Sequence, residues 1–100
     1  MISVIVPCYN EKDTIRLLLN SIDQQTYPKD DLEIVIADGM SSDGTRQAIA
    51  DFQAEHPELH IRVVDNIRRN IPSGLNAALR AARGEIIIRL DAHSMPYPDY

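Results

Sequence analysis

Short runs of β-branched residues alternate along the chain with segments of helical periodicity. The apolar runs cover residues 2–6, 32–37, 60–64 and 86–90. Each is too short for an ordinary helix and suits a strand. The last run has no polar alternation, which predicts a strand buried on both faces, as in a parallel sheet. Pro7 is expected to close the first strand, because proline cannot continue a central ladder.

Three segments between these runs repeat apolar residues three and four positions apart. The expected stripes are Ile15, Leu18, Leu19 and Ile22, then Thr45, Ala48, Ile49 and Phe52, then Leu75, Ala78, Leu79 and Ala82. Such spacing places the side chains on one face of a helix. Asn10 is positioned to cap the first helix, and Gly84 suits the C′ position of the third.

The predicted element order is therefore βαβαβαβ, with about 25 to 30 residues in each crossover unit. We expect an α/β fold of three layers around a mainly parallel sheet, in one domain that spans residues 1–100. If the strand order is 3-2-1-4, the connections of the first and fourth strands run to opposite sides. Polar groups at the carboxyl ends of the strands would then surround one crevice.

The composition says more about possible binding partners than about the fold. The 100 residues include 10 basic and 15 acidic ones, a net charge of −5, and only Arg68 and Arg69 form a basic doublet, so nucleic acid is not expected. Cys8 is the only cysteine, which excludes an internal disulfide and agrees with a reducing compartment. No apolar run approaches the roughly 18 residues of a membrane span.

Polar side chains that could carry chemistry follow three of the predicted strands. Tyr9 and Glu11 follow the first, Asp38 follows the second, and Asp91 and His93 follow the fourth. Carboxylates with an imidazole near a phosphate suit a divalent cation such as Mg²⁺ or Mn²⁺, which would neutralise a phosphate leaving group. Asp38 would instead accept a hydrogen bond from a base N–H or a ribose hydroxyl.

Each of these polar residues also has a simpler, purely structural interpretation. Asp38 is also typical of a turn, Tyr9 is compatible with the core, and Cys8 suits a small buried position without reactivity. Residues 41–45 are able either to cap the second helix or to contact phosphate, and both interpretations stay open. Asp-x-His also occurs often by chance.

Taken together, three ordered motifs are much more specific than their parts. Residues 3–11 (SVIVPCYNE), 33–45 (EIVIADGMSSDGT) and 84–93 (GEIIIRLDAH) resemble the family 2 glycosyltransferases over essentially the whole chain. The resemblance implies the nucleotide-binding half of a GT-A fold, with the acceptor half missing. The Asp-Ala-His-Ser sequence is similar to that of succinoglycan-type exopolysaccharide glucosyltransferases.

The resemblance also implies roles for individual residues. In chain order, the implied site residues are Pro7, Tyr9, Glu11, Asp38, Asp91 and His93. The first three would line the nucleoside pocket, and Asp38 would contact the base. The last two would hold the diphosphate and a divalent metal, Mn²⁺ or Mg²⁺. His93 stands where the family usually has a second aspartate. An imidazole is able to bind Mn²⁺ and is a poorer ligand for Mg²⁺, so the sequence leaves the identity of the metal open.

The function implied by the resemblance is inverting transfer of a sugar from a nucleotide-diphosphate donor, usually a UDP-sugar. The acceptor would be a saccharide or a lipid-linked molecule in polysaccharide biosynthesis, at the cytoplasmic face of a membrane. No residue matches the family's catalytic base, which is expected after Tyr100. We therefore expect this chain to bind nucleotide without turnover.

The main alternative is a nucleotide-binding module or pseudoenzyme without transfer activity. A phospho-acceptor signalling domain is disfavoured, because the first strand is not followed by an acidic pair. A dinucleotide oxidoreductase lacks its Gly-x-Gly-x-x-Gly motif. An unfinished sheet would leave an edge and an apolar face open, which favours a homo-oligomer.

Overall fold

The structure is a computed structural model of the chain and describes residues 1–24, 29–67 and 71–90. Strands and helices alternate along it. In chain order they are β1 (Ile2–Cys8), α1 (Lys12–Asp23), the 3₁₀ turn η1 (Lys29–Asp31), β2 (Leu32–Asp38), α2 (Thr45–Glu55), β3 (Ile61–Asp65), α3 (Ile71–Ala81) and β4 (Ile86–Arg89). The predicted βαβαβαβ order is confirmed.

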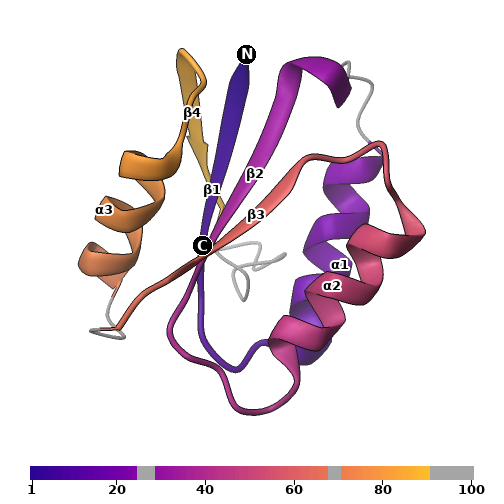
Figure 1. Cartoon of the computed structure of the whole chain (residues 1–100), viewed down its shortest axis with the longest axis vertical. Coiled ribbons are helices and arrows are strands. Elements are labelled where there is room, and N and C mark those ends of the chain that lie inside the picture. The colour runs from indigo at the N-terminus through magenta and orange to yellow at the C-terminus, as the bar shows by residue number, and fades with distance from the viewer. Residues whose placement is uncertain (25–28, 68–70, 91–100) are drawn as a thin grey trace, which may run out of the picture.

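One four-stranded sheet runs through the middle of the molecule in the order β3-β2-β1-β4, and its pairs are all parallel. α1 and α2 cover one face of the sheet, and α3 covers the other (Figure 1). The three-layer α/β architecture is therefore as predicted, and the strand order is the one on which the single crevice depends. β1 and β4 are neighbours whose connections leave on opposite faces, and α/β folds bind ligands at such a point.

The core has two parts, because successive side chains of a strand point to opposite faces of the sheet. The larger part joins Val4, Val6, Ile34 and Ile36 to the buried stripes of α1 and α2. Both stripes are buried as predicted. The smaller part, on the α3 face, consists of Ile5, Val35, Ala37 and Ala78.

The predicted stripe of α3 is only partly correct. Ala78 is fully buried, whereas Leu79 is 47% exposed. α3 approaches the sheet through small residues: a Cβ at Gly74 would lie 3.6 Å from the Cβ of Ala37. Leu79 follows Ala78 directly, so it is turned about 100° from that close contact and faces outward.

β1 continues through Pro7 to Cys8, so the prediction that Pro7 ends the strand is wrong. Gly39 N donates to the carbonyl of Cys8 on the β2 side at 2.9 Å, and Leu90 N donates to the carbonyl of Ile5 on the β4 side at 3.0 Å. The backbone groups of successive strand residues point alternately to the two neighbouring strands, so the nitrogen of Pro7 points to the β4 side, as Ile5 does. The last residue of β1 that pairs with β4 is Ile5, so Pro7 lies beyond the paired part of β4. A missing N–H there costs no ladder hydrogen bond.

β4 is an edge strand, and the prediction that it is buried on both faces is wrong. Ile86, Ile87 and Ile88 are 57%, 40% and 41% exposed. α3 packs over β1, β2 and β3 and leaves β4 outside the layers that cover the other strands. A continuous apolar run indicates that both faces of a strand are favourable to bury. It does not indicate that the described part of the chain provides the helices that bury them.

Gly84 lies beyond the end of α3, in the turn that leads into β4, and not at the predicted C′ position. Its N donates to Ser3 Oγ at 2.7 Å. A Cβ at this position would lie 2.5 Å from that oxygen and 2.8 Å from the carbonyl oxygen of Met1. The close approach of this turn to β1 therefore requires glycine.

Candidate functional site at the carboxyl edge of the sheet

The loops that follow β1 and β2 are bonded to each other at the carboxyl edge of the sheet. Asn10 N donates to Ser41 Oγ at 2.8 Å, and Asn10 Oδ1 accepts from Ser42 N at 2.9 Å. Glu11 N donates to Thr45 Oγ1 at 3.0 Å. These contacts hold the segment after β1 against the start of α2.

Asn10 shapes this loop and does not cap α1, contrary to the prediction. α1 begins at Lys12, and its N-cap residue is Glu11, which makes no side-chain capping bond. Asn10 has a φ of 50°, in the left-handed region that asparagine adopts more readily than most residues. Its side chain is bonded to Ser42 and is not directed at the first turn of α1.

The segment before α2 uses its polar groups within the protein. Asp43 Oδ1 accepts from Thr45 N at 3.0 Å and also from the Thr45 hydroxyl. Gly44 is the N-cap residue, with a φ of 97° that favours glycine. The structure therefore agrees with the capping interpretation of residues 41–45, with Asp43 as the acceptor for the first turn of α2.

Asp38 is the last residue of β2, and its side chain is fully buried. Oδ2 accepts from Ser41 N at 3.0 Å and from Arg46 Nε at 2.7 Å. Oδ1 accepts from Ser41 Oγ at 2.5 Å and from Cys8 Sγ at 3.5 Å. Burial raises the pKa of Asp38, but these hydrogen bonds outweigh it and hold the pKa below its ordinary value. A charged acceptor is therefore built into the end of β2.

Arg46 connects Asp38 to the carboxyl end of β3. Its Nη2 lies 2.5 Å from Asp65 Oδ1, while its Nε bonds Asp38. Asp65 pairs with Asp38 in the parallel register, so two neighbouring strands end in aspartate side by side. Neither Arg46 nor Asp65 is among the residues predicted from the sequence. The signal for Asp65 is an acidic residue directly after the third apolar run.

The predicted nucleoside-pocket residues lie around this edge. Tyr9 is 45% exposed and is therefore not part of the core, and Glu11 is partly buried beside it. Pro7 is buried on the α3 face, 3.5 Å from the position that a Cβ at Gly74 would take. The structure thus brings the ends of β1 and β2 together. Tyr9 and Glu11 lie at the surface of this edge, and Pro7 is buried below them against α3.

A hollow of about 310 Å³ borders the same edge between β3 and α3. It is lined by Asp65, Asn66, Ile67, Ser73, Asn76, Ala77 and Arg80. Asn66 is buried, and its N donates to the carbonyl of Asp38 at 2.8 Å. Hydrogen-bonding side chains therefore extend along the edge from β2 past β3.

The expected metal ligands, Asp91 and His93, lie outside the described residues. The strand that leads to them ends at this edge, because Leu90 N bonds the carbonyl of Ile5 in β1. Within residues 1–24, 29–67 and 71–90, no three His, Cys, Asp or Glu side chains gather into a set that could hold a metal ion. The donor chemistry of one carboxylate and one imidazole suits Mn²⁺ better than Mg²⁺.

A parallel α/β sheet with carboxylates at the strand ends, beside a switch point between β1 and β4, defines an open α/β domain of the kind that binds ligands at this edge. The sequence profile of Glycosyl transferase family 2 matches residues 3–100, and the chain belongs to this family. The resemblance drawn from the three motifs is therefore confirmed.

Relatives and solved structures agree with this assignment. The chain is 34% identical over 98 residues to the succinoglycan biosynthesis protein ExoA of Rhizobium meliloti (strain 1021), covering 96% of this chain and 28% of that protein. The mannosyltransferase PcManGT from Pyrobaculum calidifontis, solved with GDP-Man and Mn²⁺, matches with a TM-score of 0.89 and 42% identity over 98% of this chain and 29% of that one. S. aureus TarS 1-349 in complex with UDP-GlcNAc matches with a TM-score of 0.75 and 32% identity over 91% and 26%. The fold is that of the GT-A transferases.

The chain spans only part of its relatives, between 24% and 32% of the length of three curated ones. In the part of the chain that the structure describes, no helix is both long enough and apolar enough to cross a membrane. The boundaries of the domain at residues 1 and 100 and the cytoplasmic location stay predictions.

Proposed function

We propose that this chain is the donor-binding part of an inverting glycosyltransferase that uses a nucleotide-diphosphate sugar, with a saccharide or lipid-linked acceptor in polysaccharide biosynthesis. The observation that carries the proposal is the junction at the carboxyl edge. There the loops after β1 and β2 are hydrogen-bonded together around the buried carboxylate of Asp38. Family membership over residues 3–100 supports it.

In this proposal the chain's own residues bind and orient the donor. Tyr9 offers an exposed aromatic ring at the rim for the nucleoside, with Glu11 beside it. Asp38 accepts a hydrogen bond from the base. Asp91 and His93 hold the metal and the diphosphate. A divalent cation, when bound, supplies a Lewis acid that neutralises charge on the departing diphosphate.

Transfer also needs a base that deprotonates the acceptor hydroxyl as it attacks the sugar carbon. None of the residues proposed to bind the donor has that role. We therefore expect the 100-residue polypeptide to bind the donor without transferring its sugar. Sugar transfer by this polypeptide alone would contradict that restriction.

The donor is expected to be a UDP-sugar. A GDP-sugar is the second candidate, because the structural relative with 42% identity was solved with GDP-Man, whereas TarS was solved with UDP-GlcNAc. Uracil and guanine share a ring N–H that a carboxylate is able to accept from. Asp38 is therefore compatible with either base.

Isothermal titration calorimetry with UDP, UDP-glucose and GDP-mannose, each with and without Mn²⁺, tests the proposal. We expect Mn²⁺-dependent binding of at least one of them. Asp91→Ala should abolish the Mn²⁺ dependence, while Glu58→Ala, at an exposed position before the start of β3, should not. If no nucleotide binds at millimolar concentration, the proposal is wrong. Binding that ignores both Mn²⁺ and Asp91→Ala would favour a metal-free binding module.

A further inference from the structure

β4 forms one margin of the sheet, and its outer edge pairs with no strand among the described residues. Figure 1 shows β4 beside β1, at the side of the sheet away from β3. Its three isoleucines, Ile86, Ile87 and Ile88, are between 40% and 57% exposed. An open edge of this kind is a template for pairing with another chain. The sequence around the strand indicates which chain fits it.

The sequence of β4 and its flanks is complementary to itself. From Glu85 to Arg89 it is Glu-Ile-Ile-Ile-Arg, with both charged side chains exposed. In an antiparallel pair of two such strands centred on Ile87, Glu85 of each copy lies opposite Arg89 of the other. Ile86 of each copy then lies opposite Ile88 of the other. Opposite charges and β-branched side chains are both favourable as directly opposed cross-strand pairs.

The backbone of β4 supports the same register. Ile86 N and Leu90 N both donate to β1, to the carbonyls of Met1 and Ile5 at 3.4 and 3.0 Å. Because the direction of the backbone groups alternates along a strand, those of Ile87 point to the open edge. An antiparallel pair centred on Ile87 sets these outward groups opposite each other. The two copies of Ile87 are then able to exchange two hydrogen bonds.

Other antiparallel registers lose one of these matches. A shift by one residue sets outward backbone groups opposite inward ones, which breaks the ladder. A shift by two residues keeps the hydrogen bonds but sets Glu85 or Arg89 opposite Ile87, so that a charge faces an isoleucine. The register centred on Ile87 is therefore the one that suits the backbone and the side chains together.

We propose that two copies of this chain associate through β4, in antiparallel register about a twofold axis at Ile87, so that two four-stranded sheets become one sheet of eight strands. Such an interface is isologous, as in most homodimers. The paired segment is short and lies below the roughly 1,200–2,000 Å² of a stable interface, so the dimer is weak and reversible. The carboxyl edges of the two sheets point in opposite directions, and the inference does not depend on the proposed function.

Charge reversal across the axis tests the register. Arg89→Glu sets acidic side chains opposite each other at both ends of the interface, and Glu85→Arg sets basic ones there. Sedimentation velocity should therefore show that each variant has a Kd for dimerisation about tenfold or more above that of the wild type. An equimolar mixture of the two variants should regain the association, because every charged pair across the axis is then of opposite sign.

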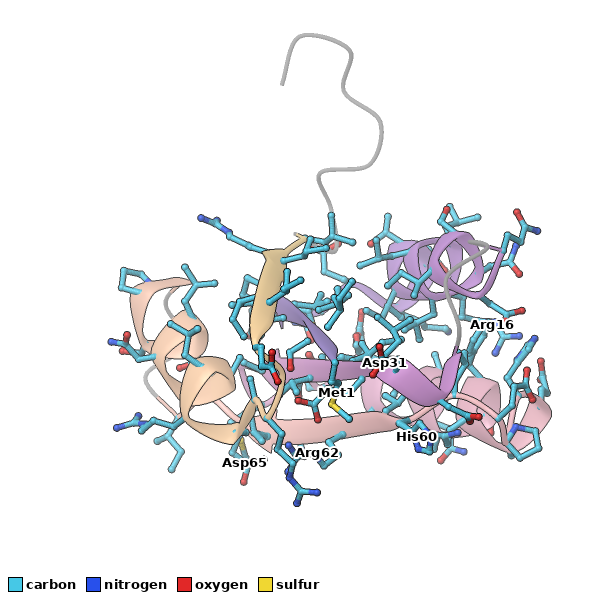
Figure 2. All side chains as sticks on the ribbon, turned by 90° about the horizontal axis from the view of Figure 1, so that it is seen from above. Met1, Arg16, Asp31, His60, Arg62 and Asp65 are labelled. Carbon is cyan, nitrogen blue, oxygen red and sulfur yellow. The ribbon has the colours of Figure 1, made fainter. Side chains whose placement is uncertain are left out.

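Arg16→Glu is the matched control, because it changes the net charge by the same amount as Arg89→Glu. Arg16 forms an exposed ion pair with Glu55 on the α1–α2 side, away from β4 in Figure 2. This variant should leave the Kd for dimerisation unchanged. Urea unfolding of each variant measures the folded fraction.

Disulfide trapping is a second measurement that needs no charge variant. Directly opposed residues of an antiparallel pair have Cα atoms about 4.5–5.5 Å apart, which is within the range of a disulfide. Ile87→Cys lies opposite its own copy, so oxidised glutathione should cross-link it. Ile86→Cys lies opposite Ile88 and should be cross-linked about tenfold more slowly or less. Cys8 is buried and serves as the internal thiol that does not cross-link.

The inference is overturned if the wild type remains monomeric up to millimolar concentration. It is also overturned if the charge-reversed variants keep the wild-type Kd, or if their mixture associates no more than either variant alone. Should a charge variant unfold, the trapping decides, and equal rates for Ile86→Cys and Ile87→Cys would exclude this register. None of these outcomes involves nucleotide binding, so the proposed function is tested separately.

Discussion

Glu33→Gln tests the buried polar cluster at the amino end of β2. The Glu33 residue is 5% exposed. Its Oε2 accepts from Ser3 Oγ at 2.6 Å and from Arg83 N at 2.5 Å, and its Oε1 accepts from Arg62 at 3.3 Å. Arg62 also donates to the carbonyl of Ala81, the last residue of α3. One carboxylate thus ties β1, β2 and β3 to the end of α3.

The magnitude follows from the lost acceptor. Glutamine has nearly the same shape, but its NH₂ group cannot accept, so the donors that face one side of Glu33 lose their partner. An unsatisfied buried hydrogen-bonding group costs about 1–3 kcal/mol. We therefore expect Glu33→Gln to lower the free energy of unfolding by about 1–3 kcal/mol, out of roughly 5–15 kcal/mol for an ordinary domain.

Urea unfolding at pH 7, followed by far-UV circular dichroism, measures this loss. Glu58→Gln is the matched control, because Glu58 is an exposed carboxylate, and it should change stability by less than about 0.5 kcal/mol. A loss in Glu33→Gln no larger than that of the control would refute the reasoning. The slope of the transition should be unchanged, since the folded structure is retained.

Acid gives an independent check of the same cluster. Burial raises the pKa of Glu33, but the bonds from Ser3 and Arg83 and the charge of Arg62 hold it below the ordinary value of 4.5. Because the pKa is lower when folded, the stabilisation is complete above about pH 4.5 and is lost as the pH falls through the folded-state pKa. The gap between wild type and Glu33→Gln should shrink on acidification, and a gap that widened would contradict this origin.

Three further predictions concern other parts of the fold. Burial, followed by the nearby charge of Asp38, raises the pKa of the Cys8 thiol, so Ellman's reagent at pH 8 should label native Cys8 more than about tenfold slower than the urea-unfolded chain. Gly84→Ala should lower the free energy of unfolding by about 1–3 kcal/mol, measured in urea, because its Cβ would overlap Ser3 Oγ. The exposed isoleucines of β4 predict weak self-association, so sedimentation velocity should show an average mass that rises with concentration, and Ile86→Lys should suppress the rise.

The order of elements and strands is predictable from the sequence because it depends on local patterns and general rules of connection. Helical stripes such as Ile15 to Ile22 show which face is buried whatever its partner is. The end of β1 at Pro7 was predicted wrongly because a strand's tolerance of proline depends on which neighbour its nitrogen faces. The burial of β4 was predicted wrongly because burial depends on which helices pack over a strand, and the sequence of the strand itself does not show that.

The site shows the same division. Asp38 is marked by its place after an apolar run, and the resemblance to the family adds the residues after β1. Arg46 and Asp65 carry no local signal that links them, since their contact depends on the register of β2 and β3 and on the length of an arginine side chain. Asn10 has good capping chemistry, but the nearby loop after β2 competes for it, and that competition is decided only by the fold.

β2 carries a buried carboxylate near each end, Glu33 and Asp38. The two differ in where their hydrogen-bond donors come from, and we expect one to serve stability and the other to serve binding. Glu33 takes its donors from neighbouring strands and the end of α3, which the sheet fixes in place. Asp38 takes its donors from Ser41 and Arg46, in the loop and helix that follow β2, and from the thiol of Cys8. Neutralising Glu33 should therefore reduce stability and leave nucleotide affinity of the folded chain unchanged. Neutralising Asp38 should change the affinity ratio between bases even where the chain remains folded.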